Sequence, residues 1–344
     1  MAVETALSRT QLADAHGRVA RDLRVSLTDR CNLRCSYCMP AEGLAWLPTP
    51  DVLTDDEFVR LIRVGVRLLG IRKVRFTGGE PLLRPGLARI VAASAELRDE
   101  HATLELSLTT NGVGLARHAE QLANAGLDRV NISLDSLDRE RYHRLSRRDR
   151  LADVLAGIDA AETSGLTPVK INAVVLRGVN EDDVVPLAEF CLDRGFELRF
   201  IEQMPLGPVH TWDRAGLVSR AEILNRLRER LVIDPVDEPR GTAPAQLWSA
   251  TSPAGRSGRI GVIASVTNPF CAACDRTRLT SDGQLRNCLF AHNETDLRGA
   301  LRGGASDDEL AELWRGGQFT KASGHGIDLP GFASPSRTMS SIGG

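Results

Sequence analysis

The sequence predicts an α/β fold, namely an incomplete (β/α)6 barrel of the TIM type followed by a smaller C-terminal α+β domain. Three observations predict it. Short runs typical of strands recur roughly every 30 residues with helical patterns between them. One face of these strands is consistently polar, and the texture of the sequence changes near residue 233. The length of 344 residues also exceeds what a single core usually supports, about 250–300 residues.

Six strands are expected, and each is a short apolar or alternating run. They cover residues 23–28, 73–79, 104–111, 129–135, 169–176 and 197–204. Helical patterns lie between most of them, for example at 55–70 and 118–127, and glycines stand where helix C-caps belong, at Gly70, Gly126, Gly165 and Gly195. Repetition of this β-α unit implies a parallel sheet.

The alternation within the strands favours a curved sheet. Arg24 and Ser26 share one face of the first strand, and Leu23 and Val25 share the other. The same division recurs in the later strands, with Arg75 and Thr77, Ser107 and Thr109, Asn131 and Ser133, and Lys170 and Asn172 on the polar face. A flat parallel sheet is covered by helices on both faces and has apolar strands throughout. A polar lumen explains the pattern better, although ordinary half-buried alternation is the alternative, and six repeats leave the barrel open on one side.

The segments we expect are an N-terminal segment 1–20, the barrel 21–232 and a C-terminal part 233–344. A last amphipathic helix is expected at 219–231, followed by short strands at 245–250 and 259–266 and a helix at 307–317. The chain ends in a Gly/Ser/Pro-rich stretch that cannot pack a core of its own.

Composition excludes some classes of function. The net charge of −2 argues against bulk electrostatic binding to a nucleic acid polymer or to anionic lipid. We find no apolar run of about 18 residues and no signal-peptide pattern, so we expect a cytoplasmic protein that does not enter a membrane. Seven cysteines in a reducing compartment indicate metal or redox ligands rather than disulfides. A homodimer is left open.

The first cysteine cluster is CNLRCSYC, which contains Cys31, Cys35 and Cys38 directly after the first strand. Zinc sites normally use four protein ligands, and this spacing lacks the fourth. A 4Fe–4S cluster held by three thiolates keeps one iron open to a substrate or cofactor. The motif therefore predicts a three-cysteine cluster at the end of the barrel where such enzymes build their sites.

CxxxCxxC with Tyr37 before the last cysteine resembles the signature of radical S-adenosylmethionine (SAM) enzymes. The resemblance implies a partial (β/α)6 barrel in which the open iron chelates SAM and one electron cleaves SAM to methionine and a 5′-deoxyadenosyl radical. The motif TGGEP, residues 77–81, resembles the segment of that family that meets the SAM amino group. Gly78 and Gly79 would allow close approach of the backbone to a ligand.

The second cysteine cluster consists of Cys271, Cys274 and Cys288. The sequence between the last two predicts a hairpin around an SDG turn that returns Cys288 to the CxxC pair. Zinc with a histidine from SGHGI or AHNE is the open alternative, whereas Cys191 lies in a helical pattern and is expected to be a core residue. Arg276 and Arg278 follow on one face and suit an anion or a purine edge.

Both cysteine clusters together with a final Gly-Gly pair resemble the GTP 3′,8-cyclase family over residues 21–344. The resemblance implies two 4Fe–4S clusters, each with three cysteine ligands and one open iron, and SAM as cofactor. It implies that the radical removes the ribose 3′ hydrogen of GTP, after which the 3′ carbon attacks guanine C8 in the first step of molybdenum cofactor (molybdopterin) biosynthesis. By the same resemblance Arg24, Arg75, Thr109, Lys170, Arg276, Thr277 and Arg278 contact GTP, and Tyr37, Gly79, Ser133 and Met204 line the SAM pocket.

Catalytic roles are expected for Arg276, Arg278, Gly343 and Gly344, and we hypothesise that the final SSIGG reaches the pocket. The resemblance also implies a flavodoxin- or ferredoxin-like electron donor and transfer of the product to the next enzyme of the molybdopterin pathway. Two alternatives stay open at this point. One is another radical SAM enzyme with an auxiliary cluster, such as a peptide-modifying one, and the other is a zinc- or cluster-stabilised binding protein without catalysis.

Overall fold

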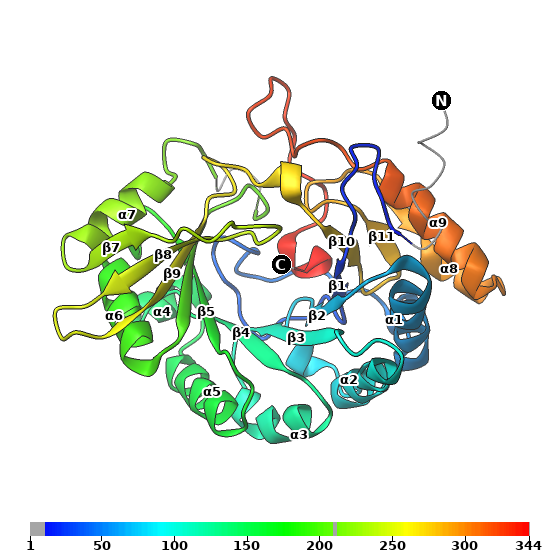
Figure 1. The fold of residues 1–344 in the computed structure, drawn as a ribbon, viewed down its shortest axis with the longest axis horizontal. Helices are drawn as coiled ribbons and strands as arrows, with labels where there is room; N and C mark the ends of the chain where they lie inside the picture. The colour runs from blue at the N-terminus through cyan, green and yellow to red at the C-terminus, as the bar shows by residue number, and fades with distance from the viewer. Residues whose placement is uncertain (1–10, 209–211, 344) are drawn as a thin grey trace.

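A single twelve-stranded sheet curves into an open barrel in the computed structural model, which describes residues 11–208 and 212–343 (Figure 1). Its strand order is β12-β11-β10-β1-β2-β3-β4-β5-β6-β9-β8-β7. The strands are β1 (Asp22–Ser26), β2 (Lys73–Thr77), β3 (Glu105–Thr110), β4 (Arg129–Ser133), β5 (Lys170–Val175), β6 (Glu197–Glu202), β7 (Val232–Pro235), β8 (Gln246–Thr251), β9 (Ser257–Ile263), β10 (Arg276–Leu279), β11 (Gln284–Arg286) and β12 (Thr295–Asp296).

The predicted (β/α)6 unit is confirmed, because β1 to β6 pair in parallel and in sequence order. Helices cover the outside of this ring (Figure 1). They are α1 (Asp55–Leu69), α2 (Leu87–Ala95), α3 (Ala119–Asn124), α4 (Arg139–Ser146), α5 (Leu151–Thr163), α6 (Val184–Arg194), α7 (Arg220–Arg228), α8 (Leu297–Arg302) and α9 (Asp307–Phe319). The short helix α10 (Met339–Ile342) lies inside the ring instead.

The strands that follow residue 232 extend the same sheet at both of its edges. β10 pairs in parallel with β1, and β9 pairs in parallel with β6, so eight strands run in the same direction. β10 and β11 form the predicted hairpin, and β7 and β8 complete the other edge. Hydrogen bonds therefore join the sequence on both sides of residue 232 in one sheet, while the division into segments 1–20, 21–232 and 233–344 stays a prediction.

Local sequence explains how a barrel repeat begins and ends. Thr54 and Glu57 form a capping box at the start of α1, where Glu57 N donates to Thr54 Oγ1 at 3.2 Å and Thr54 N donates to Glu57 Oε2 at 2.7 Å. Gly70 ends α1 in the left-handed region at φ 74°. The outward residues Leu23 and Val25 of β1 are fully buried against the helices. The inward face of β1 is thereby left for polar side chains, as the alternation predicts.

None of the helices in the described part of the chain is long and apolar enough to cross a membrane.

Candidate active site

Arginines from three neighbouring strands meet in the barrel lumen. In the sheet register Arg24 of β1 lies between Arg278 of β10 and Arg75 of β2, and Asp22 is opposite Arg276. Arg24, Arg276 and Arg278 are buried. The structure therefore brings together four of the arginines that the sequence analysis selected, although Arg24 and Arg278 are separated by about 250 residues of chain.

These arginines carry more positive charge than their surroundings offset. Burial, followed by repulsion from Arg75, holds the pKa of Arg24 well below its ordinary value, and burial and Arg276 lower the pKa of Arg278 to about 10. Burial alone would raise the pKa of Asp22, but Arg75 and Arg24 keep it below its ordinary value. Within the described residues, Nε of Arg24, Arg75 and Arg276 and Oδ1 of Asp22 have no hydrogen-bond partner. Such buried donors are normally paired, so this wall suits an anionic ligand.

The opposite wall of the lumen is partly neutralised. Lys170 of β5 lies beside Asn131 of β4 and donates through Nζ to Glu197 at 3.1 and 3.2 Å. Arg199 shares the same carboxylate at 2.6 Å. Thr109 Oγ1 accepts a weak bond from Asn131 at 3.4 Å. Burial and then Arg199 lower the pKa of Lys170, so this lysine is a cation that an added anion would stabilise.

Thr277 is directed away from this lumen. Its hydroxyl accepts from Trp314 Nε1 of α9 at 3.0 Å, and both side chains are fully buried. Of the residues matched to GTP contacts, Thr277 is therefore the one whose side chain packs under an outer helix.

The first cysteine cluster occupies the loop that follows β1. Cys38 N donates to Cys35 O at 2.9 Å, which closes a turn between these two residues. The hydroxyl of Tyr37 donates to Asp135 Oδ2 at 2.7 Å, and Val174 N donates to Oδ1 of the same carboxylate at 2.8 Å. Tyr37 thus fastens the cysteine loop to the ends of β4 and β5 rather than pointing a free hydroxyl into the lumen.

The two glycines of TGGEP are required by the cysteine loop itself. Gly79 N donates to Thr28 O at 2.7 Å. A Cβ on Gly79 would lie 2.3 Å from Arg30 O, and one on Gly78, which has φ +138°, would lie 2.4 Å from Thr28 O. Side chains at either position would push the loop away from β2. The structure thus shows a close approach of these glycines to the chain itself, and the predicted approach to a ligand stays a prediction.

Glu80 and Asn111 support the same loop, and the sequence analysis did not select them. Glu80 is fully buried and accepts from Thr110 Oγ1 and from Asn111 N, each at 2.7 Å. Asn111 Nδ2 donates to Asn32 Oδ1 at 2.7 Å and lies 3.8 Å from Cys31 Sγ. The sequence did contain a signal for these two residues. Glu80 lies in TGGEP and Asn111 in LTTNG, at the ends of the second and third predicted strands, and a parallel sheet brings these ends near the cysteine motif that follows the first strand.

Burial keeps the first set of thiols in an apolar environment. It raises the pKa of Cys31 to about 11 and that of Cys38 to about 12. Each thiol would need a bound cation to become a thiolate ligand. Burial and then Asp135 raise the pKa of the Cys35 thiol, and Cys38 and Cys31 lie close enough to raise it further. The donor set of three sulfur atoms therefore fits an iron–sulfur cluster.

The second cysteine cluster lines a cavity on the other side of the lumen. The cavity is lined by Met204, Ser265, Phe270, Cys271, Cys274, Arg276, Arg278, Asn287, Cys288, Leu289, Phe290 and His325. Arg276 lies over the Phe270 ring at 4.7 Å. The cavity is therefore continuous with the arginine wall through Arg276 and Arg278.

Lys321 is a buried cation beside this second set, and it is one of only three lysines in the chain. Its Nζ donates to Cys274 Sγ at 3.3 Å and to Arg276 O at 2.8 Å. Burial raises the pKa of the Cys274 thiol, but Arg276 and Lys321 lower it below its ordinary value overall. The two cations thus shift the pKa of the Cys274 thiol in the direction opposite to the shift of the Cys31 and Cys38 thiols.

His325 from SGHGI does not present a free nitrogen to these cysteines. Its Nδ1 accepts from Ile327 N at 3.1 Å, and its Nε2 donates to Ser265 O at 2.9 Å. His292 from AHNE is exposed. In residues 11–208 and 212–343, no group of three His, Cys, Asp or Glu side chains has the geometry to hold one metal ion. Each thiolate of a 4Fe–4S cluster binds its own iron, so this donor set fits that cluster without such convergence.

The last described residues lie inside the barrel, where Figure 1 shows the red end of the chain surrounded by strands. Ser26 Oγ donates to Ile342 O at 2.7 Å, and Arg278 Nη1 donates to Gly343 O at 2.5 Å. A Cβ on Gly343 would lie 2.3 Å from Ser26 Oγ. The tail therefore reaches the arginine wall, and Gly343 has no room for a side chain. Gly344 lies outside the described residues.

The structure places Ser133 at the end of β4 and Met204 after β6, two strands further along the sheet. Ser133 ends β4 and is opposite Asn172 of β5, whose Oδ1 is another buried atom without a partner in the described residues. Met204 lines the second cysteine cavity instead. It follows Glu202, a buried carboxylate that binds Val266 N at 2.9 Å and Thr267 N at 2.8 Å. Asn172 and Glu202 are further residues that the sequence analysis did not assign to the site.

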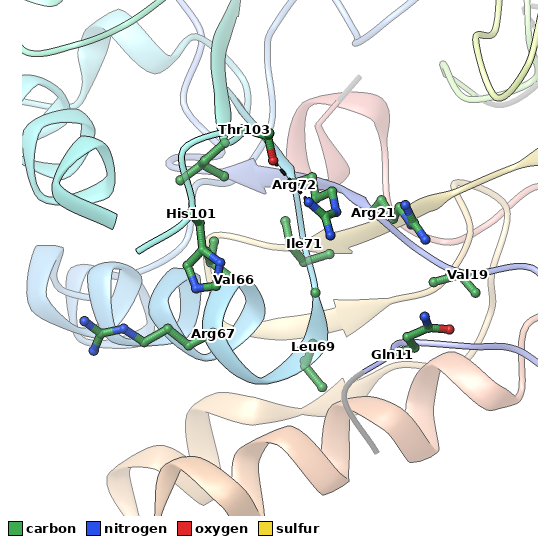
Figure 2. A pocket seen from close by; sticks show the side chains of 12 residues that line it. Gln11, Val19, Arg21, Val66, Arg67, Leu69, Ile71, Arg72, His101 and Thr103 are labelled. Carbon is green, nitrogen blue, oxygen red and sulfur yellow. Dashed lines mark hydrogen bonds between the residues drawn. The ribbon is translucent and has the colours of Figure 1, made fainter. Parts of the chain in front are cut away.

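A separate pocket opens at the opposite end of the barrel, near the start of β1 and β2. Figure 2 shows Arg21, Arg72 and His101 around it, with Arg72 Nη1 bonded to Thr103 Oγ1 at 3.1 Å. It contains none of the residues selected from the sequence. In β/α barrels the chemistry is found at the other end, where the first cysteine cluster follows β1. Cys271 and Cys274 instead directly precede β10, whose Arg276 is opposite Asp22 at the start of β1.

An open β/α barrel with three cysteines after its first strand defines a radical SAM protein, and the comparisons agree. The family model "Radical SAM superfamily" matches residues 25–191, and "Molybdenum Cofactor Synthesis C" matches residues 196–327. A GTP 3′,8-cyclase of Corynebacterium glutamicum is 62% identical over 97% of this chain and 89% of the relative. One from Mycobacterium sp. (strain KMS) is 57% identical over 97% of this chain and 93% of the relative. The chain belongs to the GTP 3′,8-cyclase family of radical SAM enzymes.

Among solved structures, the crystal structure of Streptococcus suis SuiB bound to S-adenosylmethionine is similar. It has a TM-score of 0.55 and 15% identity over 87% of this chain and 69% of that one. This likeness shows the fold alone.

Glu80 generates a prediction about stability and pH. Burial raises its pKa from about 4.5 to about 7. Between these values the folded protein binds a proton that the unfolded chain has released. The contribution of Glu80 to stability is therefore fully present below about pH 4.5 and is lost as the pH rises to about 7. Relative to Glu80→Gln, the wild-type chain should lose about 3 kcal/mol over this interval in urea unfolding of the cluster-free protein. Parallel curves for the two proteins would contradict the buried, raised-pKa carboxyl.

Proposed function

We propose that this radical SAM enzyme converts GTP to (8S)-3′,8-cyclo-7,8-dihydroguanosine 5′-triphosphate, the first step of molybdenum cofactor biosynthesis. The observation that carries the proposal is the arginine wall, in which Nε of Arg24, Arg75 and Arg276 is buried without a partner in the described residues. Buried charges cost several kcal/mol unless they are paired, and a triphosphate supplies the missing negative charge. The names of relatives at 57–62% identity support the same substrate.

The triphosphate would be held by Arg24 and Arg75 on one side and by Lys170 on the other. Guanidinium groups bind phosphate oxygens in two-point contacts, and a lysine adds a point charge. Lys170 is paired with Glu197 at 3.1 Å and would share its charge with a bound phosphate. Thr109 of β3 is opposite Asn131 in the sheet register, and Asn131 is in turn opposite Lys170. These positions support a substrate that lies across the lumen.

The guanine base would be held at the second cysteine cavity. Arg276 and Arg278 supply donors for the oxygen and nitrogen atoms of a purine edge, and Phe270 fixes the plane of Arg276. The side chain of Thr277 packs against Trp314, so its share in binding would be limited to the backbone.

SAM and the first cluster fit the loop that contains Cys31, Cys35 and Cys38. When bound, this cluster would supply the single electron for reductive cleavage of SAM, and so the radical chemistry that removes the ribose 3′ hydrogen. The chain contributes position. The network of Glu80, Asn111 and Tyr37 fixes the loop, and Gly79 and Ser133 stand at the ends of the neighbouring strands. Met204, the remaining predicted SAM contact, lines the cavity of the second cysteine cluster.

A second cluster with three cysteine ligands would be held by Cys271, Cys274 and Cys288. Both ring nitrogens of His325 have hydrogen-bond partners, which supports this assignment over zinc with a histidine ligand. Arg276 lines the same cavity as these three cysteines and would adjoin the cluster that they hold. Lys321 would stabilise the negative charge of the sulfur that it contacts at 3.3 Å.

The tail would complete the site. Gly343 fixes one nitrogen of Arg278, which directs the remaining donors of that guanidinium into the lumen. Gly344 lies outside the described residues, and its part in the site stays a prediction. Both glycines and the two arginines are therefore the groups for which we propose direct catalytic roles.

Two partners complete the proposal. A flavodoxin- or ferredoxin-like donor would reduce the first cluster, and the next enzyme of the molybdopterin pathway would take the product. The identities of 57–62% to GTP 3′,8-cyclases favour this reaction over a peptide-modifying one. The similarity to SuiB, at 15% identity, shows the fold alone and therefore favours neither reaction.

Metal content tests the two clusters. Anaerobically reconstituted protein should contain about eight irons, because two 4Fe–4S clusters are expected. Replacing Cys31, Cys35 and Cys38 together by alanine should leave about four irons, and replacing Cys271, Cys274 and Cys288 should do the same. Stoichiometric zinc bound to Cys271, Cys274 and Cys288 in the unsubstituted protein would contradict the proposal.

Turnover tests the substrate. Arg276→Ala should reduce cyclised product from GTP by about 10- to 100-fold, because hydrogen bonds to charged groups contribute about 1.5–3 kcal/mol. Iron content should not change. Arg259→Ala is the matched control, since this exposed arginine pairs with Glu238 on the edge of the sheet. Full GTP turnover by Arg276→Ala would exclude the proposed position of the base.

A further inference from the structure

The C-terminal tail is fastened to the molecule through Arg337, which the sequence analysis did not select. Arg337 lies one residue before Thr338, the N-cap of α10. Its guanidinium contacts Asp282 at two points, Nη1 to Oδ1 at 3.0 Å and Nη2 to Oδ2 at 2.8 Å. Nη2 also donates to Glu294 Oε2 at 2.7 Å. Two-point contacts of this kind fix both the plane and the direction of a guanidinium group.

The two carboxylates are themselves held in place. Asp282 lies in the turn between β10 and β11, and its Oδ1 accepts from Thr280 Oγ1 at 2.5 Å. Glu294 Oε1 accepts from Arg286 Nη1 at 2.5 Å, and Arg286 is only 1% exposed. Arg337, Asp282, Glu294 and Arg286 thus form a charge-balanced group, which we call the tail anchor. Partly buried, mutually bonded pairs of this kind are stronger than surface ion pairs.

One member of the tail anchor, Arg337, is close to Gly343 in the sequence. Another, Asp282, lies on the same hairpin as Arg278. Between Arg337 and Gly343 the backbone makes one helical turn, in which Gly343 N donates to Met339 O at 2.9 Å. β10 contains Arg278, which binds Gly343 O, and the turn that follows β10 contains Asp282. Both ends of this short segment are therefore attached to one rigid element, and release of Arg337 would leave only the inner contacts.

We propose that Arg337 is a positioning residue that holds α10 in the barrel by bridging Asp282 and Glu294, and so keeps Gly343 against Arg278. The effect on the order of the tail stands on these contacts alone. The effect on turnover rests on the proposed function.

The opposing explanation is that the four residues only stabilise the hairpin. Arg286 does serve the hairpin, since its Nη2 also binds the carbonyl of Ala291. Arg337 belongs to the tail, and in the described residues its guanidinium donates only to Asp282 and Glu294. Its removal should therefore loosen the tail and leave β10, β11 and the cysteines unchanged.

The test uses the full, cluster-loaded chain with Arg337→Gln and Asp282→Asn. Arg214→Gln is the matched control, because Arg214 forms an exposed pair with Asp328 outside the tail anchor. Hydrogen exchange of peptides within 338–343 should become at least about tenfold faster in both variants and not in the control. Exchange in β10 and the iron content should stay constant, and kcat for GTP should fall about tenfold or more.

A chain that lacks Gly343 and Gly344 separates the two claims. It should lose product formation and retain both clusters. Met339 N, which donates to Leu206 O at 3.3 Å, should stay protected, because the intact tail anchor keeps this part of the tail in place. Unchanged tail exchange in Arg337→Gln would overturn the anchor. Faster exchange with undiminished turnover would leave the anchor standing and refute the proposed role of the glycines. Loss of iron or faster exchange in β10 would show a structural role for Arg337 instead.

Discussion

Repulsion between buried guanidinium groups is the constraint on which this site depends. Arg24, Arg278 and Arg75 occupy adjacent positions on three hydrogen-bonded strands, and Asp22 offsets only part of their charge. A sheet does not gather such groups for stability, since apolar residues would pack there at less cost. The rest of the site is arranged around this wall, with a cysteine cluster on each side and the tail at its edge.

The contacts that place these groups are made by residues outside the predicted set. Glu80 joins the end of β3 to the cysteine loop, and Glu202 joins the end of β6 to the segment before the second cluster. Both are buried carboxylates at the C-terminal ends of parallel strands. Each uses its two oxygens to bind several donors from loops that would otherwise be free to move. The two cysteine loops are thereby fixed to the same rigid barrel.

Much of this could be predicted from sequence because the signals are periodic or local. The alternation of Arg24 with Leu23 and Val25 gave the inner face, and the spacing of the cysteines gave both donor sets. Thr277 departs from the GTP contact that the family resemblance implies, and the alternation of the strand already indicates this. Strand alternation places it opposite to Arg276 and Arg278, and its partner Trp314 is 37 residues away in α9. The joining of β9 and β10 to the edges of the barrel was also not predicted, because pairing of edge strands leaves no periodic trace.

The central claim is that the lumen holds GTP with its ribose presented to SAM, and one measurement tests it most directly. Anaerobic turnover with reconstituted clusters, SAM, a strong reductant and GTP deuterated at the ribose 3′ position is followed by mass spectrometry of the 5′-deoxyadenosine formed. Deuterium in that product is the predicted result, since it joins substrate, cofactor and site of hydrogen removal in a single species. Formation of 5′-deoxyadenosine without deuterium would contradict the account, because the barrel would then cleave SAM without presenting the 3′ position of GTP.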